Sequence, residues 1–251
     1  MPPKRNISFH TGSSTGPSIV EGEKNRVRKG QYSALLLLLV VLISCSGLPR
    51  LKPADSAAFA NTERQCLRPF PSSPYRLIHS VEASFPGGTQ INFLGVLLVD
   101  PRARSIHSVI MTIEGFVLFD AEFGTTVKIN RGVPPFDSVA YAEHMLKDIR
   151  LMIFPPAGRL SGAGFADDGS PVCRFRQADG TTTDISINRE SVWFIRQYNE
   201  QDLLIHTMRA SLLNESGIPE RLDLETNGSD GYALHMVLIS AEPATSETHK
   251  K

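Results

Sequence analysis

The chain has 251 residues, of which 41% are hydrophobic and 21% charged, an ordinary composition for a folded domain. It favours neither disorder over the whole length nor a membrane protein with many spans. Lys and Arg balance Asp and Glu at 26 each, but six of the basic residues and two of the acidic ones precede residue 34, so the part from Cys45 onward has a net charge of −4. Nucleic-acid binding is not expected, because it requires clustered cations.

An apolar run, 34–43, follows the basic residues Arg26, Arg28 and Lys29 and is closed by small residues. A charged, then apolar, then small-residue order is typical of a secretory signal. The run is shorter than the roughly 20 apolar residues that a membrane-spanning helix needs. A permanent transmembrane anchor is therefore the less favoured interpretation.

The four residues Leu42-Ile43-Ser44-Cys45 resemble a lipobox, whose cysteine receives diacylglycerol in bacterial lipoproteins. We predict a lipoprotein signal peptide over 1–44 and lipidation of Cys45 with fatty chains such as palmitate. Two or more such chains hold a protein stably in a bilayer. An ordinary cleaved signal with an unmodified cysteine is the alternative. Ser46 stands where aspartate retains enteric lipoproteins in the inner membrane, so the resemblance implies the periplasmic face of the outer membrane.

The segment before the apolar run is unusually long for a signal and rich in Ser, Gly and Pro. One hypothesis is that translation starts at Val27, which would leave a signal of ordinary length. N-terminal sequencing of the unprocessed precursor would contradict this hypothesis if it found Met1.

Residues 45–74 contain several prolines and scattered charges without a sustained helical or strand period, which predicts a lipidated tether. Cys66 lies in this stretch and Cys173 lies beyond it. Export to an oxidising compartment permits a disulfide between them. A disulfide and two free thiols both remain open, because nothing in the sequence sets the distance between the two residues.

From Tyr75 onward, short β-rich runs alternate with turn residues, which predicts a large antiparallel sheet. Asp179-Gly180 is a strong hairpin signal and predicts a type I′ turn with positive φ at both residues. Residues 243–251 are expected to be a disordered tail. The predicted strands are 75–85, 89–99, 105–113, 116–119, 172–177, 181–188, 192–198, 203–213, 221–226 and 232–239.

One helix interrupts the strands, because apolar residues recur at helical spacing from Val139 to Ile153. Asp137 is expected to cap its first amides, and Phe136 with Tyr141 to form a hydrophobic staple. Pro155-Pro156 ends the segment. The helix should lie on the sheet, with Glu143, Lys147 and Arg150 on its charged outer side.

No catalytic grouping stands out. No serine lies in a Gly-x-Ser-x-Gly elbow, and the histidines form no zinc-binding spacing. His144 and Asp148 are four residues apart on the predicted helix and are expected to make a solvated surface contact. Asp167-Asp168-Gly169-Ser170 lacks the ligand spacing of a calcium loop and is expected to be a plain turn. We therefore expect no metal, no cofactor and no enzyme activity.

Four segments together resemble an uncharacterised family of LolB-like outer-membrane lipoproteins: 105–123, 126–156, 172–187 and 215–240. In that family the helix ends in an aromatic residue and proline, here Phe154 and Pro155. The resemblance covers the domain 75–242. It implies a mainly β (α+β) fold, a curved antiparallel half-open barrel with one or more helices covering its concave face, as in LolA and LolB.

The resemblance also implies an apolar cavity for acyl chains, walled by alternating strand residues and the helix stripe. The alternative is that the same residues are ordinary core, as most of them must be for the domain to fold. The candidate cavity residues are Phe93, Leu97, Val109, Met111, Ile113, Leu146, Ile149 and Met152.

Three hypotheses follow for the function. The first is a non-enzymatic carrier of acyl chains, lipid or lipoproteins, anchored in the membrane by its N-terminal lipid. The second is a structural or assembly lipoprotein that holds an envelope protein, with the concavity filled by its own side chains. The third and least favoured is a periplasmic hydrolase. The chain is expected to be a monomer or part of an envelope complex.

Overall fold

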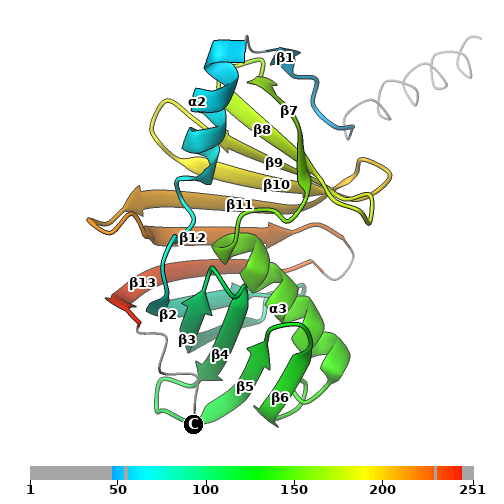
Figure 1. Ribbon diagram of the computed structural model, residues 1–251. Coiled ribbons are helices and arrows are strands. Elements are labelled where there is room, and N and C mark those ends of the chain that lie inside the picture. Colours follow the sequence, from blue (N-terminus) through cyan, green and yellow to red (C-terminus); the bar gives the residue numbers. More distant parts are fainter. Residues whose placement is uncertain (1–46, 54–55, 229–230, 245–251) are drawn as a thin grey trace, which may run out of the picture. The chain divides into compact units, whose positions relative to one another are not determined.

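The computed structural model describes residues 47–53, 56–228 and 231–244. They form a 13-stranded antiparallel sheet in the order β1-β7-β8-β9-β10-β11-β12-β13-β2-β3-β4-β5-β6 (Figure 1). The predicted large antiparallel sheet is confirmed, and it is open, with β1 and β6 at its edges. The strands are β1 (Lys52–Pro53), β2 (Tyr75–Ser84), β3 (Gln90–Asp100), β4 (Ser105–Met111), β5 (Val117–Phe123), β6 (Val127–Gly132), β7 (Arg159–Phe165), β8 (Pro171–Arg176), β9 (Thr182–Ile187), β10 (Trp193–Tyr198), β11 (Leu204–Leu213), β12 (Pro219–Thr226) and β13 (Ala233–Pro243).

The signal segment 1–44 and Cys45 lie outside the described residues, as do residues 245–251 of the expected tail. The sheet continues one residue past the predicted domain end, because Pro243 pairs with Tyr75. Within the described residues, neither helix is long and apolar enough to cross a membrane.

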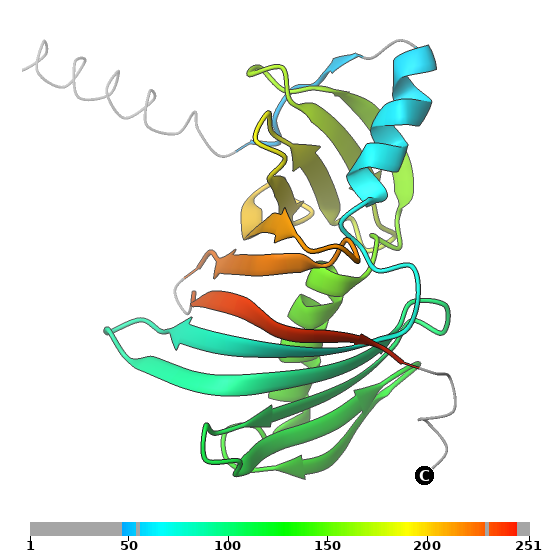
Figure 2. The same ribbon diagram turned by 90° about the vertical axis from the view of Figure 1, so that its left-hand side faces the viewer.

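Two helices pack on the sheet (Figures 1 and 2). Helix α2 (Ser56–Leu67) contacts β7, β8 and β9, and helix α3 (Val139–Ile153) lies over the other part of the sheet, where it contacts the edge strand β6. A single hydrophobic cluster contains buried residues of both helices, such as Cys66 and Leu146. The apolar side chains that alternate along the strands therefore meet both helices on one face of the sheet.

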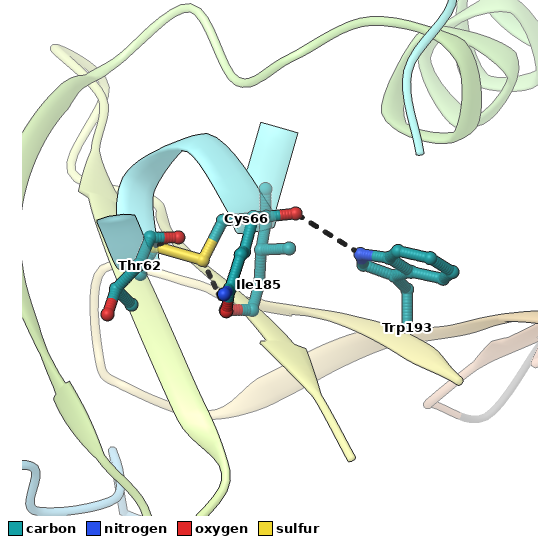
Figure 3. The surroundings of a disulfide bond; sticks show 6 residues. Thr62, Cys66, Ile185 and Trp193 are labelled. Atoms are coloured by element: carbon teal, nitrogen blue, oxygen red, sulfur yellow. Dashed lines mark hydrogen bonds between the residues drawn. A yellow bond between two sulfur atoms is a disulfide. The ribbon is translucent and has the colours of Figure 1, made fainter. Parts of the chain in front are cut away.

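The segment 45–74, predicted as a tether, instead contributes α2 and the edge strand β1 to the folded unit. Cys66 is fully buried and forms a disulfide with Cys173 of β8, 107 residues further along the chain. Trp193 Nε1 donates a hydrogen bond to the carbonyl oxygen of Gln65, at 3.4 Å (Figure 3). Periodicity alone did not indicate this helix, because its place depends on contacts with residues more than 100 positions away.

The hairpin at Asp179-Gly180 is confirmed, but its turn is not type I′. Gly180 has a φ of +84°, whereas Asp179 is not among the residues with positive φ. The Gly180 N–H donates to Gln177 O, and the Gln177 N–H donates to Thr181 O. This is the longer hairpin loop in which a type I turn is followed by one left-handed residue. A single left-handed position suffices, and glycine supplies it.

Strands β6 and β7 were not predicted. β6 is an edge strand whose residues are at most half-buried, and β7 has the sequence RLSGAGF, in which small residues replace the branched ones that indicate a strand. Both are recruited by pairing, β6 with β5 and β7 with β8. β7 carries little of the apolar alternation on which the strand predictions rest, and in β6 the alternation is confined to Val127 and Ile129.

Helix α3 has the predicted bounds, with one correction at its start. The N-cap is Ser138, whose hydroxyl accepts the Tyr141 N–H, and not Asp137. The predicted contact between Phe136 and Tyr141 is confirmed, because their rings meet edge to face at 5.3 Å, although the shift of the N-cap moves both residues one position from those of a hydrophobic staple. The helix ends at Ile153 with Phe154 as C-cap, directly before Pro155.

His79 of β2 is the one histidine among the described residues that lies fully inside the core. Its side chain is 3% exposed, its Nε2 has no hydrogen-bond partner, and burial lowers its pKa to about 4. Between pH 6.5 and 4 the unfolded chain therefore binds a proton at this residue that the folded chain does not. Folding stability must fall as the pH falls through this window.

We predict that urea unfolding of the wild type shows a loss of up to about 3 kcal/mol between pH 7 and 4 that originates from His79. The variant His79→Leu should lose this part of the pH dependence. The control His144→Gln, which changes an exposed histidine of α3, should keep it. Equal slopes in the His79→Leu and wild-type proteins would contradict the assignment.

Candidate functional site

The apolar stripe of α3 is buried against the sheet. Leu146, Ile149 and Met152, predicted as cavity residues, are 1%, 8% and 6% exposed. They belong to the same cluster as Phe119 of β5 and Ile106 of β4. In this structure the protein's own side chains occupy the space between α3 and the inner face of the sheet.

The other predicted cavity residues do not all share that face. Leu97 is buried and Phe93 half-buried against the core. Val109 and Met111 alternate with the buried residues Ile106, Ser108 and Ile110 of β4, so they point to the opposite face. Ile113 lies in the turn after β4 and is 68% exposed. Both faces of β4 carry branched or long apolar residues, so alternation alone gave no way to choose between them.

A polar cluster joins the middle of α3 to the sheet. Asp148 accepts a hydrogen bond from the Tyr232 hydroxyl, and its Oδ1 lies 3.2 Å from His206 Nε2 of β11. His206 Nδ1 lies 3.0 Å from Oε1 of Gln197, on β10. Asp148 and Gln197 are 7% and 5% exposed. We call these four residues the Asp148 cluster.

The Asp148 cluster departs from the prediction for this helix. Asp148 was expected to contact His144 at the surface, but His144 is exposed and Asp148 faces the sheet. Burial, and then the neighbouring Asp148 charge and hydrogen bond, raise the pKa of Tyr232 strongly. Tyr232 therefore stays protonated and donates to the carboxylate. The sequence did not show this attachment, because the partners of Asp148 come from strands far along the chain.

A cleft runs along one side of α3, between the helix and the ends of several strands. Its volume is about 520 Å³, within the ~300–1,000 Å³ range of small-molecule sites. Gln197 of the Asp148 cluster also lines it. Its apolar lining includes Phe123, Val127, Leu151 and Phe154, together with 155–157. Its cations are Arg104, Lys147 and Arg150, and its carboxylates are Glu143 and Asp179.

Two arginines are built into the cleft wall. Arg150, expected on the solvated side of α3, lies with its guanidinium 4.4 Å from the centre of the Phe123 ring. Arg104, from the turn between β3 and β4, lies 5.3 Å from the Phe154 ring and donates to Pro155 O at 3.2 Å. Burial, and then the charge of Arg104, lower the pKa of Arg150. Stacking of a guanidinium on an aromatic face compensates part of this cost.

The remaining histidines of the described strands form separate pairs. His107 Nε2 lies 2.9 Å from Asp120, and His235 Nδ1 lies 2.5 Å from Asp223. His107 alternates with the buried residues of β4, so this pair is on the face away from α3. Among residues 47–53, 56–228 and 231–244, no three His, Cys, Asp or Glu side chains converge to hold a metal ion.

No protein-family model matches the chain, and no curated protein matches it in sequence. Among solved structures, its fold is similar to a LolA superfamily protein from Nitrosomonas europaea, with a TM-score of 0.51 and 11% identity over 75% of this chain and 94% of that one. A DUF1329 family protein from Desulfovibrio piger gives a TM-score of 0.48 and 10% identity over 78% and 95%. The described domain therefore shares its fold with the Nitrosomonas europaea protein, and the fold that the resemblance in sequence implied is confirmed.

We predict that the Asp148 cluster holds α3 through coupled hydrogen bonds. Tyr232→Phe should destabilise the wild type by about 2 kcal/mol, because it removes a bond to a charged acceptor. In the Asp148→Ala background, where the acceptor is gone, the same change should cost less than about 0.5 kcal/mol. Urea unfolding of the four proteins measures the coupling. Tyr75→Phe, whose hydroxyl has no hydrogen bond in the described structure, is the control, and equal costs in both backgrounds would refute the coupling.

Proposed function

We propose that this protein is a non-enzymatic lipoprotein of the outer membrane that binds acyl chains, either of a lipid or of a lipoprotein, during transport in the envelope. The lipidated Cys45 is its anchor, and the domain faces the periplasm. The observation that carries this proposal is an open cleft with apolar walls beside the helix that covers the inner face of a LolA-type sheet.

The cleft offers an acyl chain both apolar surface and a way in. Phe123 and Val127 come from the sheet side, and Leu151 and Phe154 from the end of α3. Each methylene removed from water contributes about 0.8 kcal/mol. Because the space under α3 is filled by Leu146, Ile149 and Met152, a longer chain extends inward only where α3 moves off the sheet.

The Asp148 cluster is suited to control that movement. Hydrogen bonds between α3 and the sheet are directional, so they break over a short displacement, whereas apolar contacts can be replaced by those of an acyl chain. Gln197 belongs to the cluster and also lines the cleft. A ligand in the cleft therefore reaches the groups that attach the helix.

One observation favours a second candidate function. The inner face is packed with the protein's own side chains, among them the fully buried Phe119, which is the state expected of a lipoprotein that holds an envelope protein and carries no lipid. The two candidates differ in a measurable way, because only the carrier binds acyl chains in proportion to protein.

The anchor is tested by Cys45→Ala. We expect the wild type, labelled with radioactive palmitate, to sediment with outer membranes, and the variant to lose the label and remain unprocessed at the signal. Cys66→Ala with Cys173→Ala is the control, because it removes the other two cysteines and leaves the label in place. Labelled protein after Cys45→Ala would refute this anchor.

The carrier function is tested by mass spectrometry of lipid bound to the full chain purified from membranes in mild detergent. We expect about one lipid per protein, not counting the covalent chains. Leu151→Glu places a carboxylate in the apolar part of the cleft and should lower the occupancy at least about tenfold, because burying an unpaired charge is costly. Val139→Glu, on the same helix at a residue that is 59% exposed, should leave it unchanged.

Two results would count against the carrier. Absence of bound lipid from the wild type, together with an envelope protein that co-purifies in stoichiometric amount, would support the assembly function. Equal loss of lipid in Leu151→Glu and Val139→Glu would show that the cleft is not where the chains lie.

A further inference from the structure

The two cleft arginines, Arg104 and Arg150, are cations without a matching anion. Within the described part of the chain, no carboxylate oxygen lies within 4.0 Å of either guanidinium. Their mutual repulsion is large enough to contribute to the lowered pKa of Arg150. Two neighbouring guanidiniums that repel each other are stabilised by a negative group bound between them.

The carboxylates of the cleft do not supply that negative group. Asp179 accepts hydrogen bonds from the backbone N–H and the hydroxyl of Thr181, at 2.9 and 2.6 Å. These bonds chiefly, and to a smaller extent the charge of Lys147, hold its pKa low. Glu143 lies on the exposed side of α3 and forms no ion pair with either arginine.

Further donors in the cleft wall are unused. Arg150 Nε and Thr183 Oγ1 are buried and have no hydrogen-bond partner among the described residues. The residues carrying them both line the cleft. Unpaired buried donors cost free energy in the empty protein, and an oxygen-rich anion would satisfy them. The unpaired donors and the two positive charges therefore both favour an anionic ligand with several oxygen atoms.

We infer that Arg104 and Arg150, with Thr183, form a site for the phosphate group of the ligand that occupies the cleft. This inference rests on the proposed function and narrows it to amphiphiles with an anionic phosphate headgroup. The rings of Phe123 and Phe154, on which the two guanidiniums stack, also line the apolar part of the cleft. Headgroup and acyl chain are therefore recognised side by side.

The experiment measures equilibrium binding to the full chain in non-ionic detergent micelles. Three probes are compared: phosphatidic acid, a diacylglycerol with the same two acyl chains, and inorganic phosphate. We expect phosphatidic acid to bind the wild type at least about tenfold more tightly than diacylglycerol. In the double variant Arg104→Gln/Arg150→Gln this preference should disappear while the affinity for diacylglycerol stays the same.

Arg131→Gln is the matched control. Arg131 also stacks on a phenylalanine, with its guanidinium 5.3 Å from the Phe116 ring, but it lies outside the cleft lining. The control should keep the tenfold preference for phosphatidic acid. Thermal unfolding of all variants shows whether each remains folded, and Arg150→Lys, which keeps the charge, should retain part of the preference.

The outcomes separate this inference from the proposed function. Equal binding of both lipids to the wild type and the double variant would overturn the phosphate site and leave the carrier function standing. Binding of inorganic phosphate alone, lost in the double variant, would confirm the site with a free anion as its ligand and refute the carrier. Binding of none of the three probes would overturn both.

Discussion

An open antiparallel sheet with one apolar face is unstable in water unless that face is covered, and this constraint organises the whole domain. Here α2 covers the part built from β7–β9, and α3 covers the part that ends at β6. Along β2 and β4, fully buried side chains alternate with half-buried or exposed ones, and the buried set marks the covered face. Helix α3 is thus both a part of the core and the boundary of the cleft.

In the proposed function, acyl chains would reach the same face of the sheet that α3 covers, so the helix and the ligand would compete for one apolar surface. Apolar packing positions the helix through the fit of its side chains, and hydrogen bonds add a directional attachment. The Asp148 cluster supplies that direction at the middle of the helix. Arg104 adds a second attachment where the helix ends, through Pro155. These polar contacts fix the position of α3 beside the open cleft.

Much of this fold could be predicted from the sequence, for reasons visible in particular residues. The segment Val139–Ile153 has apolar residues at helical spacing, an aromatic pair near its start and prolines after its end. These signals are local, so they can be recognised in the sequence. Most strands are bounded by turn residues such as Gly180 and carry apolar alternation. Where alternation is missing, as in β7, pairing with a neighbour decides the structure. Where both faces of a strand are apolar, as in β4, the sequence predicts the strand but not which of its two faces is buried.

The residues of the candidate site could not be predicted in the same way. Arg104 comes from a turn, Arg150 from α3 and Thr183 from β9, and only the folded sheet brings them to one cleft. The charged residues of α3 were all expected at the surface. Glu143 and Lys147 are exposed, whereas Asp148 and Arg150 face other parts of the protein. Amphipathic patterns describe the preferences of each side chain for water. They do not reveal an acid or a guanidinium that has a partner inside.

The disulfide has a further consequence for α3. Residues 66 and 173 are joined covalently, and the chain between them contains β2 to β7 and the whole of α3. Helix α3 therefore lies inside a closed covalent loop, between strands β6 and β7, which pair with β5 and β8. The connections 133–138 and 154–158 that join the helix to β6 and β7 are short, so they limit how far α3 could move from the sheet in the proposed function.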